Sequence, residues 1–123
     1  MDATISAAKQ IVIGESVLLA RNVYISDHGH AFDDVSRPIM AQGITIPAPV
    51  FIGSGTWIGQ NAVILPGTVI GKNCVIGANS VVNRSVPDFT VAVGVPARLL
   101  KTFNPTTGHW IKIDRASSAQ EMK

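Results

Sequence analysis

The sequence predicts an all-β protein built as a parallel β-helix, a prism wound from short strands. Aliphatic residues recur at every sixth position, and glycine often follows them. A period of six matches neither the 3.6-residue period of an amphipathic helix nor the simple alternation of a strand. Gly, Val, Ile and Thr dominate the repeat, and these residues disfavour helix. The repeated aliphatic positions are Ile13, Leu19, Ile25, Ile46, Ile52, Ile58, Ile64, Ile70, Ile76 and Val82.

Three hexads are expected to close one triangular coil, so that each hexad forms one face of the prism. The leading aliphatic points inward and stacks on its counterpart in the next coil, about 4.8 Å away. The small or β-branched residue at the fifth position also points inward, which makes Cys74 a buried packing residue. The glycine after the leading residue is expected to form the corner, where φ can be positive. The sixth positions face outward, as at Val63, Val69, Val75 and Val81.

The β-helix domain is predicted over residues 1–87, followed by a C-terminal extension over residues 88–123. Residues 1–12 hold only a degenerate hexad (Ala7 and Ile11), so the first coil is expected to be poorly closed. The pattern stops at Pro87, and the chain is expected to leave the prism there. Within the extension, HWIKI (109–113) is predicted as one more strand and the polar tail 115–123 as frayed.

One interruption breaks the repeat, because the 21 residues from Ile25 to Ile46 are not a multiple of six. A protruding loop is therefore predicted over residues 28–45. The segment DHGH (27–30) opens it and is the densest cluster of titratable side chains in the chain. Long irregular loops in compact domains usually carry function or are disordered, and the cluster favours function.

Composition narrows the class of protein further. The chain has 123 residues, 46% apolar and 15% charged, with a mean hydropathy of +0.30, which predicts one folded domain rather than disorder. A net charge of +2 without a basic run argues against nucleic acid, and no apolar run is long enough to span a membrane. Cys74 is the sole cysteine, which excludes an internal disulfide or a cysteine zinc cluster. Without a signal peptide, a cytoplasmic protein is expected, with some apolar surface buried between subunits.

Two segments, IGESVLLARNVYISDHGHAFDD (13–34) and IPAPVFIGSGTWIGQNAVILPGTVIG (46–71), resemble the hexapeptide-repeat acetyltransferases, and so does the exit VPARLLK (95–101). The resemblance covers about residues 11–102, and the most similar group is the sugar O-acetyltransferases. It implies a left-handed parallel β-helix, a homotrimer, and acetyl-CoA as acetyl donor. It also implies an active site between subunits, where the loop of one reaches its neighbour.

The resemblance assigns roles to individual residues. The family's catalytic histidine falls on His30 in an ungapped alignment, and its coenzyme-contacting tryptophan falls on Trp57. Ala78 falls on a position whose backbone N–H touches the pantetheine arm. The polar N-terminal residues that bind the acceptor in this family have no counterpart here, so the acceptor is specified only as a sugar or related hydroxyl compound. The basic residues expected near the coenzyme phosphates are Arg84, Arg98 and Lys101.

Acetyl transfer to a hydroxyl needs a base that removes the hydroxyl proton, and histidine suits this task. Asp27, Asp33 or Asp34 could orient the imidazole of His30, as in other His–carboxylate pairs. The donor that stabilises the oxyanion is left open between a backbone N–H and a loop side chain.

Two other functions remain open at this point. His28, His30 and His109 could hold zinc, as three histidines do in hexapeptide-repeat carbonic anhydrases, although no metal is expected because His109 lies outside the repeat. Alternatively, the chain could be a non-catalytic β-helix scaffold that lacks an acceptor site.

Overall fold

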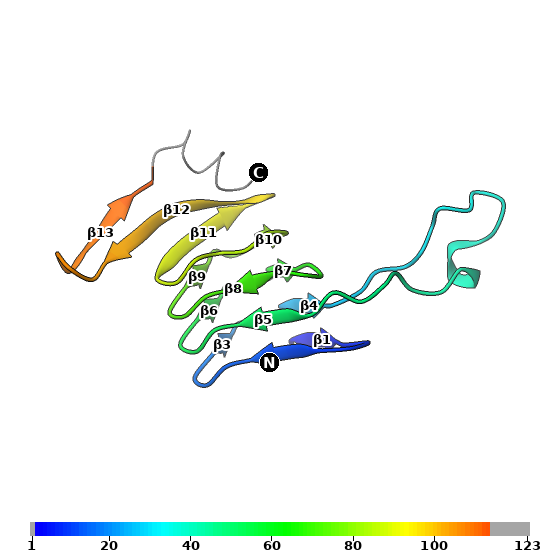
Figure 1. Ribbon diagram of the computed structural model, residues 1–123, viewed down its shortest axis with the longest axis horizontal. Coiled ribbons are helices and arrows are strands. Elements are labelled where there is room, and N and C mark those ends of the chain that lie inside the picture. The colour runs from blue at the N-terminus through cyan, green and yellow to red at the C-terminus, as the bar shows by residue number, and fades with distance from the viewer. Residues whose placement is uncertain (1, 114–123) are drawn as a thin grey trace.

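Short strands wind around three sides of a prism in the computed structural model, which describes residues 2–113. Figure 1 shows the coils stacked one on another, with a long loop projecting sideways from the stack. The successive coils consist of β1 (Thr4–Ser6), β2 (Ile11–Ile13) and β3 (Leu18–Leu19); β4 (Tyr24–Ser26), β5 (Val50–Ile52) and β6 (Trp57–Ile58); β7 (Val63–Ile64), β8 (Val69–Ile70) and β9 (Val75–Ile76); and β10 (Val81–Val82), a bridge at Val86 and β11 (Thr90–Gly94).

Each side of the prism is a parallel sheet, because each strand pairs with its counterpart in the next coil. The sheets follow the orders β1-β4-β7-β10, β2-β5-β8 and β3-β6-β9-β11. Their registers place like residues opposite each other, with Ile25 on Ile64, Ile52 on Ile70 and Ile58 on Ile76. The all-β prediction and the six-residue repeat are thereby confirmed.

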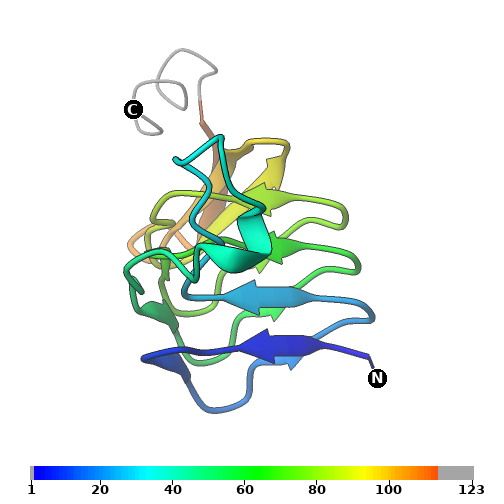
Figure 2. The ribbon, with the colours of Figure 1, turned by 90° about the vertical axis from the view of Figure 1, so that its right-hand side faces the viewer.

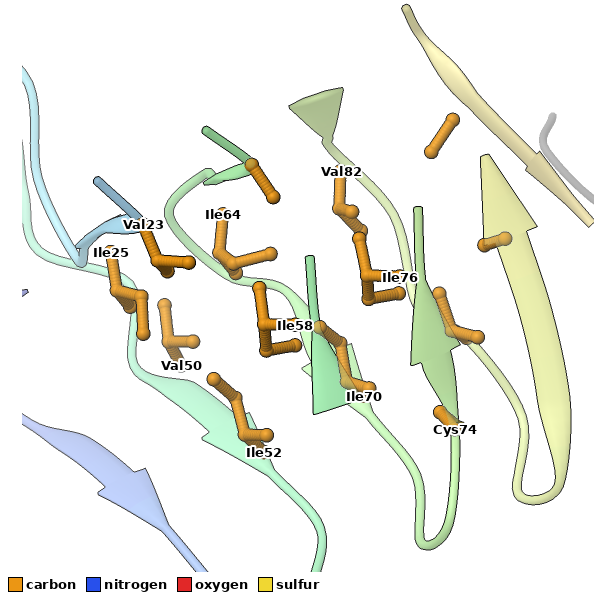
Figure 3. Close-up of a cluster of buried hydrophobic side chains, with 14 of the residues drawn as sticks. Val23, Ile25, Val50, Ile52, Ile58, Ile64, Ile70, Cys74, Ile76 and Val82 are labelled. Atoms are coloured by element: carbon orange, nitrogen blue, oxygen red, sulfur yellow. The ribbon is translucent and has the colours of Figure 1, made fainter. Parts of the chain in front are cut away.

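The core is the column of side chains inside the prism (Figure 3). From Ile52 onward every leading aliphatic up to Val82 is at most 2% exposed, and so is Ile25. Thr56 and Thr68 are buried at fifth positions and donate their hydroxyls to the carbonyls of Gly71 and Val82. Cys74 is 1% exposed, as predicted.

The loop that interrupts the six-residue repeat is longer than predicted, and Ile46 is not part of the core. Ile46 is 93% exposed, and the repeat resumes only at β5, so the loop comprises residues 27–49. A turn of 3₁₀-helix, η1 (Ile39–Ala41), lies within it. Ile46 precedes Ile52 by six residues by coincidence, because it lies on the returning limb of the loop.

The prism extends further than predicted at both ends. Residues 4–6 and 11–13 form β1 and β2 and pair with β4 and β5, so the N-terminal coil is more regular than a degenerate hexad at Ala7 and Ile11. At the other end, β11 pairs in parallel with β9, so the chain does not leave the prism at Pro87. The departure occurs after Gly94, where β12 (Ala97–Asn104) and β13 (His109–Lys112) add antiparallel strands. The strand predicted over 109–113 is confirmed, and the tail 115–123 lies outside the described residues.

The repeated glycines serve close packing, not positive φ as predicted. A Cβ atom on Gly53 would lie 2.5 Å from the carbonyl carbon of Gly71, and one on Gly59 would lie 2.7 Å from the nitrogen of Ala78. The left-handed conformation occurs instead three residues after the leading aliphatic, where glycine or asparagine tolerates it. These positions include Gly55 (φ 76°), Asn61 (φ 63°), Gly67 (φ 78°), Asn73 (φ 49°) and Asn79 (φ 61°).

Candidate active site

The loop of residues 27–49 leaves the prism as an ordered stem of two antiparallel limbs. The N–H of Thr45 donates to the carbonyl of Gly29 at 2.8 Å, and the N–H of Ala31 donates to the carbonyl of Gly43 at 3.0 Å. His30 and Ile44 form the bridge between these two hydrogen bonds. Figure 2 looks at the loop from its far end, in front of the stacked coils. The titratable cluster therefore lies where the stem joins the prism.

His30, the predicted base, lies on this stem with an exposed side chain. Within residues 2–113, its ring makes no hydrogen bond to another group of the chain. Asp34 does not orient it, because its carboxylate accepts the hydroxyl of Ser36 at 2.6 Å and the N–H of Ser36 at 3.0 Å. These two bonds lower the pKa of the Asp34 carboxyl. The ring of His30 is thus free to face a group from outside the chain.

Asp27, another of the aspartates considered, contacts His28 instead of His30. Its Oδ1 lies 2.8 Å from Nδ1 of His28. Asp27 is 0% exposed, and the side chain of His28 is 18% exposed. This His–carboxylate pair was not foreseen, although the two residues are adjacent in the sequence.

Asp27 is held by the turn that joins β1 to β2. Its carboxylate accepts the backbone N–H groups of Ala8, Lys9 and Gln10, each at 2.8 Å. Burial alone would raise the pKa of the Asp27 carboxyl, but the bonds from Ala8, His28, Lys9 and Gln10 together hold that pKa far below its usual range. Asp27 is therefore a carboxylate at neutral pH, and Nδ1 of His28 must carry the proton that it donates.

Most of the residues expected to contact the coenzyme lie on or beside one sheet, which contains β6, β9, β11 and β12. Trp57 begins β6 and is 49% exposed, whereas Ala78 lies in the exposed turn between β9 and β10. Arg84 is exposed after β10, Arg98 is exposed on β12, and Nζ of Lys101 lies 5.8 Å from the ring centroid of Trp110. The turn that holds Ala78 packs directly on Gly59, two residues after Trp57. Arg84 follows β10 and so lies beside a different sheet.

Comparison with known proteins settles the family. The family description "Bacterial transferase hexapeptide (six repeats)" matches residues 49–84. A maltose O-acetyltransferase of Clostridium difficile 630 is 32% identical in sequence, with a TM-score of 0.65 over 82% of this chain and 67% of the other. This chain belongs to the hexapeptide-repeat acetyltransferases. The resemblance read from the sequence is thereby confirmed.

Two further members of the hexapeptide-repeat acetyltransferase family bear on the acceptor and the coenzyme. A protein of Escherichia coli (strain K12), named for O-acetyl transfer in lipopolysaccharide biosynthesis, is 40% identical over 114 residues, covering 88% of this chain and 58% of its own. A galactoside acetyltransferase solved in complex with coenzyme A is 32% identical, with a TM-score of 0.71 over 91% of this chain and 62% of the other. The chain spans between 33% and 58% of the length of three curated relatives.

An aromatic pocket at the C-terminal hairpin was not predicted for this family member. Phe89, Phe103 and Trp110 line it together with Asn73 and Pro105. The rings of Phe103 and Trp110 meet edge to face, with centroids 5.5 Å apart. Because Phe89 belongs to a prism turn and the other two rings to β12 and β13, only the folded chain brings them together.

The sequence raised the questions of a metal site and of a membrane span. In the part of the chain from residue 2 to residue 113, no three His, Cys, Asp or Glu side chains gather as a metal site would require. Over the same residues, no helix is long and apolar enough to cross a membrane.

Proposed function

We propose that the protein is an acetyl-CoA-dependent O-acetyltransferase that acts on a sugar or a related hydroxyl acceptor. Membership of the hexapeptide-repeat acetyltransferases supports this proposal, as do relatives named for galactoside, maltose and lipopolysaccharide acetylation. The observation that carries it is His30, which lies on an ordered stem at the edge of the prism and whose ring has no hydrogen-bond partner within residues 2–113.

His30 acts as the general base in this proposal. Its imidazole takes the proton of the acceptor hydroxyl as that oxygen attacks the carbonyl carbon of the acetyl group. A C–O bond forms, the C–S bond breaks, and coenzyme A leaves as the thiol after receiving a proton.

Trp57, Ala78, Arg84, Arg98 and Lys101 would hold the coenzyme. The backbone N–H of Ala78 fits its role, because within residues 2–113 it donates no hydrogen bond and the turn is exposed. The exposed guanidinium groups of Arg84 and Arg98 suit phosphate oxygens. Lys101 would have to leave its contact with Trp110, or share it, to reach a phosphate.

The assembly we propose is a homotrimer of left-handed β-helices, with the loop of each subunit lying against a neighbour. Large apolar side chains are exposed along this loop, which a monomer in water would not favour. They are Phe32 (64%), Val35 (98%), Ile39 (52%), Met40 (90%), Ile44 (47%) and Ile46 (93%). Equilibrium sedimentation at micromolar concentration is expected to give three times the chain mass of 13.0 kDa. A monomer there would contradict both the trimer and the shared active site.

Release of free thiol from acetyl-CoA in the presence of a panel of sugars tests the function. We expect thiol release that depends on the acceptor and is matched by formation of an O-acetyl ester. Binding of coenzyme A without release for any acceptor would favour a scaffold instead. Zinc-dependent hydration of CO2 would favour the carbonic-anhydrase alternative.

A further inference from the structure

Asp27 is the residue at which the loop joins the prism, and it makes contacts in three directions. Its backbone N–H donates to the carbonyl of Ser6 on β1, and its own carbonyl accepts the N–H of Ala48 on the returning limb at 2.8 Å. Its carboxylate accepts the three N–H groups of the turn from Ala8 to Gln10. Asp27 therefore connects the N-terminal coil to both limbs of the loop.

His28 is held at both its ring and its backbone. Nδ1 donates to Oδ1 of Asp27 at 2.8 Å. The hydroxyl of Ser26, a residue only 3% exposed, donates to the carbonyl of His28 at 2.8 Å and accepts its N–H at 3.3 Å. The ring and the backbone of His28 are therefore both restrained.

The restraint continues without a break from His28 to His30. Gly29 donates its N–H to Oγ1 of Thr45 at 2.9 Å and accepts the N–H of Thr45 with its carbonyl. His30 then forms the bridge with Ile44. Asp27, His28 and Gly29 are thus each hydrogen-bonded to a neighbour, and His30 is held between the bonds that Gly29 and Ala31 make to the returning limb.

We propose that Asp27 and His28 are positioning residues for His30: the Asp27–His28 hydrogen bond fixes the base of the stem and so the direction in which the ring of His30 is presented. This inference rests on the proposed acetyl transfer with His30 as base. It makes the N-terminal turn at residues 8–10 part of the support of the active site. An error of about 1 Å in the position of a catalytic group can cost as much as 10²-fold in rate, so a restraint here has kinetic value.

The hydrogen bond also sets the tautomer of His28. Because the carboxylate of Asp27 can only accept, the neutral ring must carry its proton on Nδ1 and leave Nε2 bare. Ring ¹⁵N NMR of the protein without ligands is expected to show this single tautomer for His28 at neutral pH. A protonated Nε2 with a bare Nδ1 would overturn the inference.

His28→Ala and His28→Asn provide the kinetic test. Asparagine places its side-chain N–H near the position of Nδ1, so it keeps the bond to Asp27 without an imidazole. We expect His28→Ala to lower kcat about tenfold, short of the ~10²-fold cost of a full 1 Å error. The KM of the acceptor and the Kd of coenzyme A should stay within about twofold, and His28→Asn should recover most of kcat. His109→Ala, which changes an exposed histidine on β13, is the matched control and should match the wild type.

Each departure from this result has a distinct meaning. An unaffected His28→Ala overturns the inference, because the bond then positions nothing. An asparagine variant as impaired as the alanine variant also overturns it, since the imidazole itself would be needed. A raised acceptor KM at constant kcat would show that His28 contacts the acceptor instead. If the wild type transfers no acetyl group, the proposed function fails and this inference fails with it, whereas an active wild type isolates the failure to His28.

Discussion

Replacing His30 with alanine is expected to lower acetyl transfer by roughly 10²–10⁴-fold, the usual contribution of a positioned general base. The variant should fold and assemble normally, because the His30 side chain is exposed and belongs to no part of the core. It should still bind coenzyme A, since the proposed contacts at Trp57, Ala78 and the basic residues lie elsewhere. Thiol release and isothermal titration with coenzyme A measure the two properties separately.

The second histidine completes this test. His28→Ala should be far less impaired. A nearly normal His30→Ala beside a severely impaired His28→Ala would mean that the other histidine is the base. Normal turnover in both would remove the loop histidines from the mechanism.

Replacing Ile64 with aspartate is expected to unfold the protein. Ile64 is 0% exposed and stacks between Ile25 and Val82 in the central column of the prism. A carboxylate there would have no partner, and the cost, about 4 kcal/mol or more, is comparable with the whole ~5–15 kcal/mol of a typical domain. Thermal melts followed by circular dichroism measure the effect.

Two matched substitutions show whether the loss of stability comes from placing a charge in the core or from changing the residue as such. Ile64→Val should cost only about 0.5–1.5 kcal/mol, because it removes one methylene from the same place. Ile46→Asp introduces the same charge at a position with the same apparent six-residue spacing, yet Ile46 is 93% exposed. It should leave the fold of the single chain intact, and any loss should appear as weaker association of subunits, because Ile46 is one of the loop side chains proposed to lie against a neighbour. If Ile64→Asp melted like the wild type, or Ile46→Asp unfolded the chain, the assignment of inward positions would be wrong.

The repeat is the part of the fold that the sequence predicts well, because each hexad packs on its counterparts in neighbouring coils in the same way. Ile52, Ile58 and Ile64 are buried for the same reason, and one rule covers all of them. The rule fails at Ile46 because spacing alone does not reveal where an insertion ends. It also fails at β1, whose residues Thr4–Ser6 carry little of the aliphatic pattern and are placed by pairing with β4.

The site is less predictable because its contacts join segments far apart in the chain. The sequence draws attention to DHGH, but it does not show that Asp27 turns back to the N–H groups of Ala8, Lys9 and Gln10. It therefore offers no way to assign Asp27 to His28 rather than to His30. The proximity of the turn at Ala78 to the end of β6, the strand that Trp57 begins, is likewise a property of the folded coils.

The most direct test of the central claim is a crystal structure of the protein with coenzyme A. We expect a trimer in which the coenzyme lies between two subunits and its sulfur lies near the ring of His30. Trp57, the N–H of Ala78 and the basic groups of Arg84, Arg98 and Lys101 should contact the same coenzyme molecule. A coenzyme bound far from His30, or within a monomer, would contradict the proposed active site.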